Sequence, residues 1–173
     1  IFYGSIGDFG YLAISNTGRV HTVSLKDQIP IEDRLFNDVW QVESTSSGVY
    51  FLTRTKIFRF HNGKISVINA KFASSQATVV NGQLFYLDAD RGLSFLEADQ
   101  VKPVKALAGF ANNRRMVLTT IAPHQVLVGR ISGDFHVIDL RSLWDEEHHR
   151  YQTEREDLGN TNILQRITTP IDS

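Results

Sequence analysis

Histidine and acidic residues gather in one segment that could hold a metal ion. This segment, Trp144-Asp145-Glu146-Glu147-His148-His149-Arg150, places two histidines side by side after two glutamates. Adjacent histidines on a helix point about 100° apart, and the His-Glu-x-x-His spacing that puts two ligands on one face is absent. We therefore interpret the segment as a solvated, charged stretch and predict no metal site and no cofactor.

Three further patterns only partly match motifs that bind or react. Asp88-x-Asp90 before Gly92 suggests a calcium loop, but no glutamate follows at the position that binds the ion with both oxygens, so an ordinary turn is favoured. The glycines between positions 4 and 10 precede neither a helix nor a Gly-Lys-Ser/Thr sequence. No Gly-x-Ser-x-Gly is present to expose a nucleophilic serine. We predict no catalytic residues and no enzyme activity for this chain.

Short β-type runs must position these residues, and they recur along the chain. Gly48–Asn62 contains two such runs around a polar turn, which predicts an antiparallel hairpin. The same form begins again at Ile1, Leu84 and Val126, with a period of roughly 35 to 48 residues, which is typical of propeller blades and several other repeats. The Asn-Gly pairs Asn62-Gly63 and Asn81-Gly82 predict two-residue hairpin turns.

The pattern predicts an all-β fold, a partial β-propeller of four-stranded antiparallel blades. About three and a half blades would form an open arc, cut from a ring of about seven. Because the chain opens inside a repeat, we expect a fragment of a longer protein. Within this one propeller domain, spanning 1–173, the expected parts are blades at about 1–23 (partial), 39–68, 75–105 and 116–141. They are followed by 142–173 as a charged connector and the start of the next blade, whose inner strand would be 162–167.

Two other stretches have expected roles in this arrangement. The connection Ser24–Asn37 is long enough to have structure of its own, with one helical turn after Pro30. The aromatic residues of the first two repeats could stack on sugars or bases, but in a propeller they more often fill the space between blades, and that interpretation is favoured for Phe9, Tyr11, Phe58 and Phe60.

Bulk composition excludes several classes of protein. The net charge is −1, so no basic field attracts nucleic acid, and no apolar run is long enough to cross a bilayer. We expect no direct membrane contact by this chain. Cysteine is absent, which excludes disulfides and thiolate chemistry but is compatible with either the cytoplasm or the periplasm.

Several stretches resemble the periplasmic sensor propellers of bacterial signalling proteins, of the two-component-regulator type. The blade signature is matched by Val126–Gly129 with Gly133–Asp139, and the more distinctive likeness lies in Gly4–Leu12, Ser24–Trp40 and Gly48–Arg54. Glu154–Leu158 before Asn162 is similar to that family's link into the next blade. The second and third repeats depart from the pattern where a Gly-Thr-like pair is typical.

The resemblance implies an extracytoplasmic module that senses a small ligand or a partner protein for a histidine kinase or diguanylate cyclase. The parent protein would be anchored in the inner membrane, with this part in the periplasm. Two alternatives stay open: a protein-interaction scaffold without signalling output, and a propeller enzyme that uses turn acids. An open arc also leaves blade edges exposed, so we expect self-association through them.

The best candidate site comprises the turns that join the second and third strands of each repeat. In a propeller these turns emerge on one face, where charged side chains would converge on a ligand or partner. The residues concerned are Asp8, Arg54, Arg91, Arg130 and Asp134.

Overall fold

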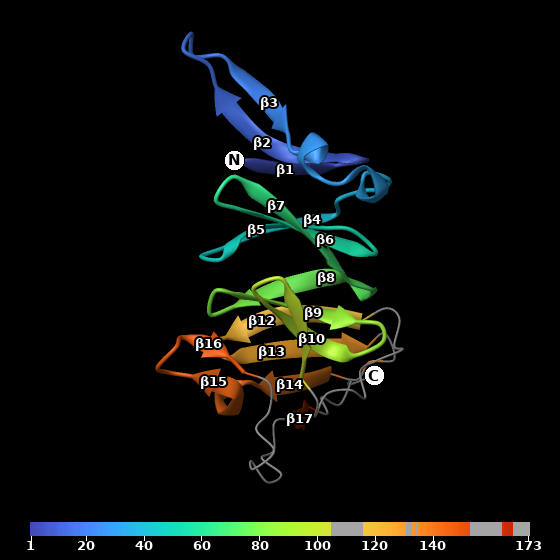
Figure 1. Ribbon diagram of the computed structural model, residues 1–173. Helices are drawn as coiled ribbons and strands as arrows, with labels where there is room; N and C mark the ends of the chain where they lie inside the picture. Colours follow the sequence, from blue (N-terminus) through green and yellow to red (C-terminus); the bar gives the residue numbers. More distant parts are fainter. Residues whose placement is uncertain (105–115, 131–132, 134, 153–163, 168–173) are drawn as a thin grey trace, which may run out of the picture. The chain divides into compact units, whose positions relative to one another are not determined.

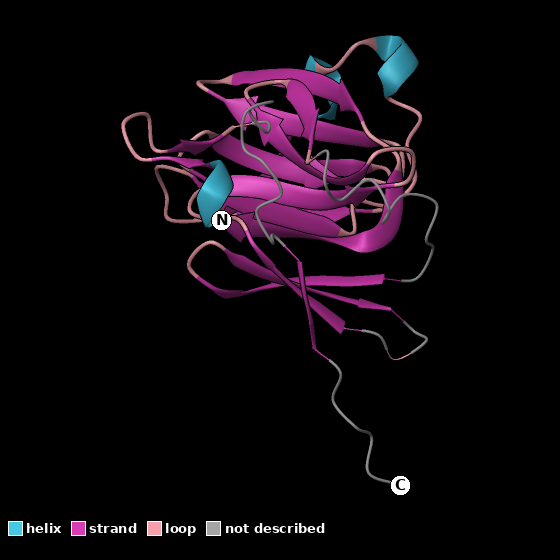
Figure 2. Cartoon of the chain, turned by 90° about the horizontal axis from the view of Figure 1, so that it is seen from below, coloured by secondary structure: helices cyan, strands magenta, loops and turns pink. Residues whose placement is uncertain are grey.

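The computed structural model describes residues 1–104, 116–130, 133, 135–152 and 164–167. Strands dominate these residues, and the helical segments are short turns (Figures 1 and 2). The prediction of an all-β chain built from antiparallel sheets is confirmed. The chain divides into two compact units, Ile1–Lys71 with Ala98–Gln100, and Phe72–Glu97 with Val101–Ser173.

Unit 1 contains a three-stranded and a four-stranded sheet, each a meander in chain order. The strands of the first sheet are β1 (Phe2–Ser5), β2 (Asp8–Ile14) and β3 (Val20–Ser24). Those of the second sheet are β4 (Gln41–Thr45), β5 (Gly48–Leu52), β6 (Lys56–His61) and β7 (Lys64–Asn69).

The core of unit 1 is an aromatic layer between its two sheets. Phe9 of the first sheet stacks on Phe58 of the second, with ring centroids 4.9 Å apart, and Tyr11 stacks on Phe60 at 6.3 Å. Phe9 and Phe58 are fully buried. The prediction that these four aromatic residues pack between sheets is therefore confirmed.

The long connection in unit 1 is structured and anchored in the core. It forms two 3₁₀ turns, η1 (Lys26–Gln28) and η2 (Ile31–Asp33), where one helical turn was expected. Leu25 and Ile29 are buried in the aromatic core. Lys26 donates a 2.7 Å hydrogen bond through Nζ to the carbonyl of Gly7, which ties the connection to the first hairpin.

Unit 2 contains two four-stranded sheets and a small hairpin. The strands of the third sheet are β8 (Phe72–Val80), β9 (Gln83–Asp88), β10 (Gly92–Glu97) and β11 (Gln100–Pro103). Those of the fourth are β12 (Met116–Ala122), β13 (Gln125–Arg130), β14 (Phe135–Asp139) and β17 (Leu164–Ile167). The turn η4 (Arg141–Leu143) leads into the hairpin of β15 (Trp144–Asp145) and β16 (Arg150–Tyr151).

Two segments at the end of the chain differ from expectation. The strand within 162–167, expected to begin a further repeat, is β17, which pairs antiparallel with β14 as the fourth strand of the fourth sheet. Within the stretch expected to be a charged connector, residues 144–151 contain the paired strands of the β15–β16 hairpin. Chain spacing alone does not distinguish a strand that opens a new sheet from one that closes the preceding sheet.

The Asn-Gly turns form as predicted. Asn62 and Gly63 have φ angles of 49° and 75°, and Asn81 and Gly82 have 45° and 79°, as a type I′ hairpin turn requires. The equivalent turn between β12 and β13 is Pro123-His124, in which His124 has a φ of 61°. A non-glycine residue in this left-handed region is uncommon, and histidine is among the types enriched there.

Truncation of Phe58 tests whether the aromatic layer stabilises unit 1. We expect Phe58→Ala to lower the free energy of unfolding by about 3–5 kcal/mol, because it removes a fully buried ring and leaves a cavity. Urea unfolding followed by tryptophan fluorescence, to which Trp40 in unit 1 contributes, measures this loss. Leu35→Ala is the control, since Leu35 is 94% exposed and its loss should change stability by less than about 0.5 kcal/mol. Equal effects of the two substitutions would contradict the assigned core.

Candidate functional site

Asp8, one of the predicted site residues, lies at the start of β2 and is bound within its own sheet. The Tyr3 hydroxyl donates to one carboxylate oxygen at 2.9 Å, and the Ser24 hydroxyl donates to the other at 2.5 Å. Burial, together with the hydrogen bond to Asp8 and its negative charge, raises the pKa of Tyr3. Asp8 thus links the three strands of the first sheet.

Arg54 and Arg91 lie exposed in the turns that join the second and third strands of their sheets, as predicted. Each turn is held by a buried polar residue just before it. Thr53 donates its hydroxyl to the carbonyl of Lys56 at 2.9 Å. Asp88 accepts the backbone N–H groups of Asp90 and Arg91, both at 3.0 Å. The Asp88–Gly92 segment is therefore an ordinary turn, as the sequence indicated.

The predicted convergence of these turns stays a prediction. Asp8 and Arg54 belong to unit 1, whereas Arg91 belongs to unit 2. Arg130 is the last residue of β13, but its side chain lies outside the described residues, and so does Asp134.

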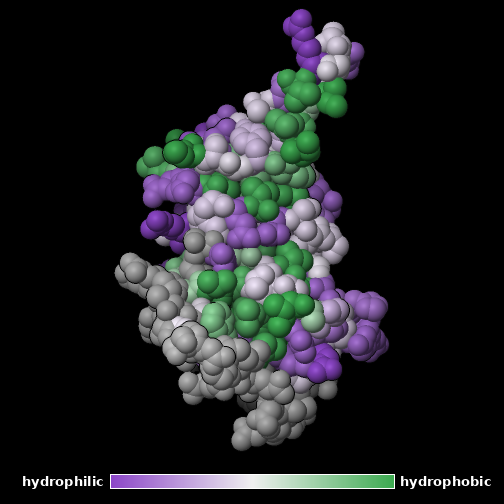
Figure 3. All heavy atoms as spheres, turned by 180° about the vertical axis from the view of Figure 1, so that it is seen from behind, coloured by the Kyte–Doolittle hydropathy of each residue, from purple (hydrophilic) through white to green (hydrophobic). Residues whose placement is uncertain are grey.

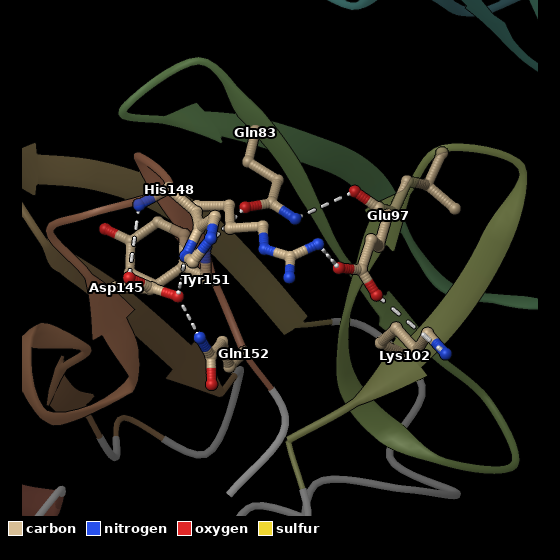
Figure 4. A network of polar contacts seen from close by, with 9 residues as sticks. Gln83, Glu97, Lys102, Asp145, His148, Tyr151 and Gln152 are labelled. Atoms are coloured by element: carbon tan, nitrogen blue, oxygen red, sulfur yellow. Dashed lines mark hydrogen bonds and ion pairs between the residues drawn. The ribbon is translucent and has the colours of Figure 1, made fainter.

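A polar and aromatic network around the β15–β16 hairpin is the candidate site that the structure itself points to (Figure 4). Its turn is organised by Asp145, whose Oδ1 accepts the backbone N–H groups of Glu147 and His148 at 3.1 and 3.2 Å. Asp145 Oδ2 is 2.8 Å from His148 Nδ1 and accepts a further hydrogen bond from Gln152. Burial alone would raise the pKa of Asp145, but these hydrogen bonds outweigh it and hold that pKa below its usual value.

The hairpin is fastened to the third sheet by two polar contacts. The Gln83 side chain accepts the backbone N–H of Tyr151 at 2.8 Å and donates to the carbonyl of Leu96 at 3.0 Å. Arg150 donates to Glu97 at 2.7 Å, beside a longer 3.9 Å ion pair between Glu97 and Lys102. Figure 4 shows Gln83 and Glu97, from the third sheet, facing the hairpin. A segment that lies in sequence between the third and fourth strands of the fourth sheet is thereby joined to the third sheet.

Tyr151 connects the hairpin to the turns of both sheets. Its ring is fully buried, and its hydroxyl lies 2.9 Å from Nδ1 of His124, in the β12–β13 turn. Asn81, in the β8–β9 turn, donates to the same hydroxyl at 3.3 Å. Burial raises the pKa of Tyr151, so the hydroxyl stays protonated and can donate its proton to His124.

Trp144 is in ring contact with three other residues of this site. Its indole ring packs edge-on against His124 at 5.0 Å and against Tyr151 at 4.8 Å, with His149 at 6.4 Å. His124 and His149 both have left-handed backbone conformations, with φ angles of 61° and 49°. We call Trp144, His124 and His149 the indole–imidazole cluster. It combines a flat apolar surface with ring nitrogens that can donate or accept hydrogen bonds.

The sequence offered two partial signals for this cluster. It marked the paired histidines as unusual, and it placed His124 in a turn whose equivalent in the preceding repeat is Asn81-Gly82. It could not show that Asn81, His124 and Tyr151 meet, because Asn81 and Tyr151 are 70 residues apart. Within the described ranges, no group of three or more histidine, cysteine or acidic side chains is arranged to hold a metal ion.

Comparison with known proteins finds no matching family model, curated protein or solved structure. None of the helices in the described part of the chain is long and apolar enough to cross a membrane.

Asp139 gives the segment leading into the hairpin a pH-dependent contribution to stability. Hydrogen bonds from the Arg141 guanidinium lower the pKa of Asp139 from 3.8 to about 2. A carboxylate with a lowered pKa stabilises the fold at pH values above its pKa in the unfolded chain, which is about 4. This contribution is lost as the pH falls toward the folded-state pKa of about 2. The Arg141 side chain is 71% exposed, so we expect no more than about 1 kcal/mol.

Asp139→Asn should therefore flatten the pH dependence of stability. Urea unfolding followed by tryptophan fluorescence, to which Trp144 in the hairpin contributes, is compared at about pH 5 and about pH 2.5 to measure the difference. The natural chain should lose more stability between these two values than Asp139→Asn does. The same loss in both proteins would show that the Asp139–Arg141 pair does not stabilise this segment.

Proposed function

We propose that this chain is a non-catalytic binding module that senses a small ligand or a partner protein outside the cytoplasm of a bacterium. Its sheets would be blades of a partial propeller within a histidine kinase or diguanylate cyclase. The indole–imidazole cluster would be its contact surface. The resemblance of Gly4–Leu12 and Ser24–Trp40 to sensor propellers favours the signalling context.

The relation between the third and fourth sheets supports blade-like stacking in unit 2. Their first strands, β8 and β12, lie beside each other and are joined by hydrogen bonds between residues 42 positions apart. Leu118 N–H donates to the Gln76 side chain, and Thr120 N–H donates to the Thr78 hydroxyl, at 3.2 and 3.1 Å. The constant offset means that these strands run in the same direction. Propeller blades, which are successive four-stranded meanders around a central channel, place their first strands in this way.

The observation that carries the binding proposal is the backbone strain beside Trp144. Non-glycine residues in left-handed conformations cost free energy, and such residues concentrate at sites of function. His124 and His149 both adopt this conformation within ring contact of one tryptophan. Two imidazoles beside an indole suit a ligand that offers a flat face and hydrogen-bonding groups, such as a sugar, an amino acid or a short peptide.

A ligand screen with two matched variants tests this surface. The probes are free amino acids, mono- and disaccharides, and short peptides. We expect at least one class to raise the melting temperature of the natural chain, and His149→Ala to abolish that rise, because the imidazole is lost from the cluster. His21→Ala is the control, since His21 is also exposed but lies on β3 of unit 1. A rise that survives His149→Ala would place the binding elsewhere, and no rise with any probe would contradict the ligand-binding role.

Sequencing the gene on both sides of the region for these 173 residues tests the signalling role. A membrane helix followed by kinase or cyclase motifs is the expected result. A reading frame with neither would contradict the sensor function and would favour the second candidate, an interaction scaffold. That candidate draws support from the exposed apolar side chains Ile6, Ile31 and Leu35 in unit 1, which are 87%, 79% and 94% exposed.

A further inference from the structure

The outer face of the fourth sheet has the residue pattern of a covered face. Cross-strand pairs place Leu127 opposite Val137 and Gly129 opposite Phe135. The equivalent pairs of the third sheet, 42 residues earlier in the chain, are Phe85 opposite Phe95 and Leu87 opposite Leu93. Those four residues are all 0% exposed, because the fourth sheet packs on them.

The equivalent residues of the fourth sheet are less completely covered: Gly129 is buried, Leu127 and Val137 are partly buried, and Phe135 is exposed. Phe135 is 39% exposed and Val117, which pairs with Gly129, is 47% exposed. A Cβ atom on Gly129 would lie 2.8 Å from the Phe135 ring, so glycine allows this ring to lie flat across the sheet. We call Val117, Leu127, Phe135 and Val137 the donor face.

The first sheet also has an apolar outer face, on the side away from the second sheet. Its inner face, with Phe2 and Tyr11, packs on the second sheet. Strand alternation then places Ile1, Leu12, Ile14 and Val20 on the outer face, where the backbone N–H of Leu12 bonds to the carbonyl of Ile1 and Ile14 pairs with Val20. We call these four residues the acceptor face.

The acceptor face is equivalent in position to a buried face of the fourth sheet. Ile1 lies opposite Leu12 as Val126 lies opposite Ile138. Val126 and Ile138 are 0% exposed because they pack on the third sheet, whereas Ile1 and Ile14 are 89% and 74% exposed. Figure 3 shows hydrophobic side chains gathered along the β2–β3 hairpin.

We infer that a second copy of this chain covers these faces, the donor face of one copy packing on the acceptor face of the next. The interface would continue the sheet-on-sheet packing that each unit already contains once. Because the two faces differ, the contact is head-to-tail, and such contacts build either a closed ring or an open chain of copies. The inference does not depend on the proposed sensing role.

Two single-face variants test the inference with the full chain. Ile14→Glu places a charge on the acceptor face and Val117→Glu places one on the donor face, each at a position exposed in the single chain. Sedimentation velocity from about 1 µM to about 1 mM should show the natural chain increasing in mass with concentration. Each variant alone should remain a single chain across that range, since association needs both faces.

Mixing the two variants is the decisive step. Ile14→Glu retains a donor face and Val117→Glu retains an acceptor face, so a one-to-one mixture should form dimers and nothing longer. Gln28→Glu, at an exposed position that belongs to neither face, should associate like the natural chain and controls for added charge. Circular dichroism verifies folding, and Val20→Glu with Phe135→Glu provide a second pair of variants if either of the first does not fold.

Three outcomes would overturn the inference. The natural chain could remain a single chain at about 1 mM. One variant alone could still dimerise, which would mean that like faces pair. The mixture could fail to form dimers although each variant is folded.

Discussion

Burial of apolar side chains between the faces of neighbouring sheets is the interaction on which the other features depend. A meander of four short strands cannot shield both of its faces, so each sheet requires a neighbour. In unit 1, aromatic rings pack between the two sheets, as Phe9 does on Phe58. Unit 2 has a mixed layer in which Phe85 and Phe95 of the third sheet pack on Val126 of the fourth. The exposed apolar faces of the first and fourth sheets follow from the same constraint.

The β15–β16 hairpin shows how a site can be added to such packing. Leu143 and Tyr151 extend the buried core of unit 2, and this burial fixes the hairpin in place. Once fixed, the hairpin places Trp144 against the His124 ring. It also places the buried Tyr151 hydroxyl within hydrogen-bonding distance of two turn residues, His124 and Asn81. The polar contacts set the orientation, since a buried hydroxyl requires partners. The buried core thus stabilises the hairpin, and the turn residues provide the hydrogen-bonding side chains of the site.

Much of the fold could be predicted because its signals are local. Alternating apolar runs specify strands, and Asn81-Gly82 specifies a hairpin turn through the backbone freedom of its two residues. The aromatic packing around Phe58 was also predictable, since a ring on the inner side of a strand has few other places to lie. The ends of the chain were less predictable: β17 could open a new sheet or close the previous one, and local sequence does not distinguish the two.

The sequence by itself determined which neighbouring strands form hairpins, the hairpin turns and the apolar side of each sheet, because these depend on residues close together in the chain. Tertiary structure alone decided which distant turns meet. Asn81, His124 and Tyr151 are brought together by sheet packing, and no local pattern encodes their contact. It also decided that Asp8 links the strands of its own sheet, because only the folded sheet brings Tyr3 and Ser24 to its carboxylate. These contacts join residues far apart in the chain, so they depend on how the sheets pack and not on local sequence. This is the physical reason for the division.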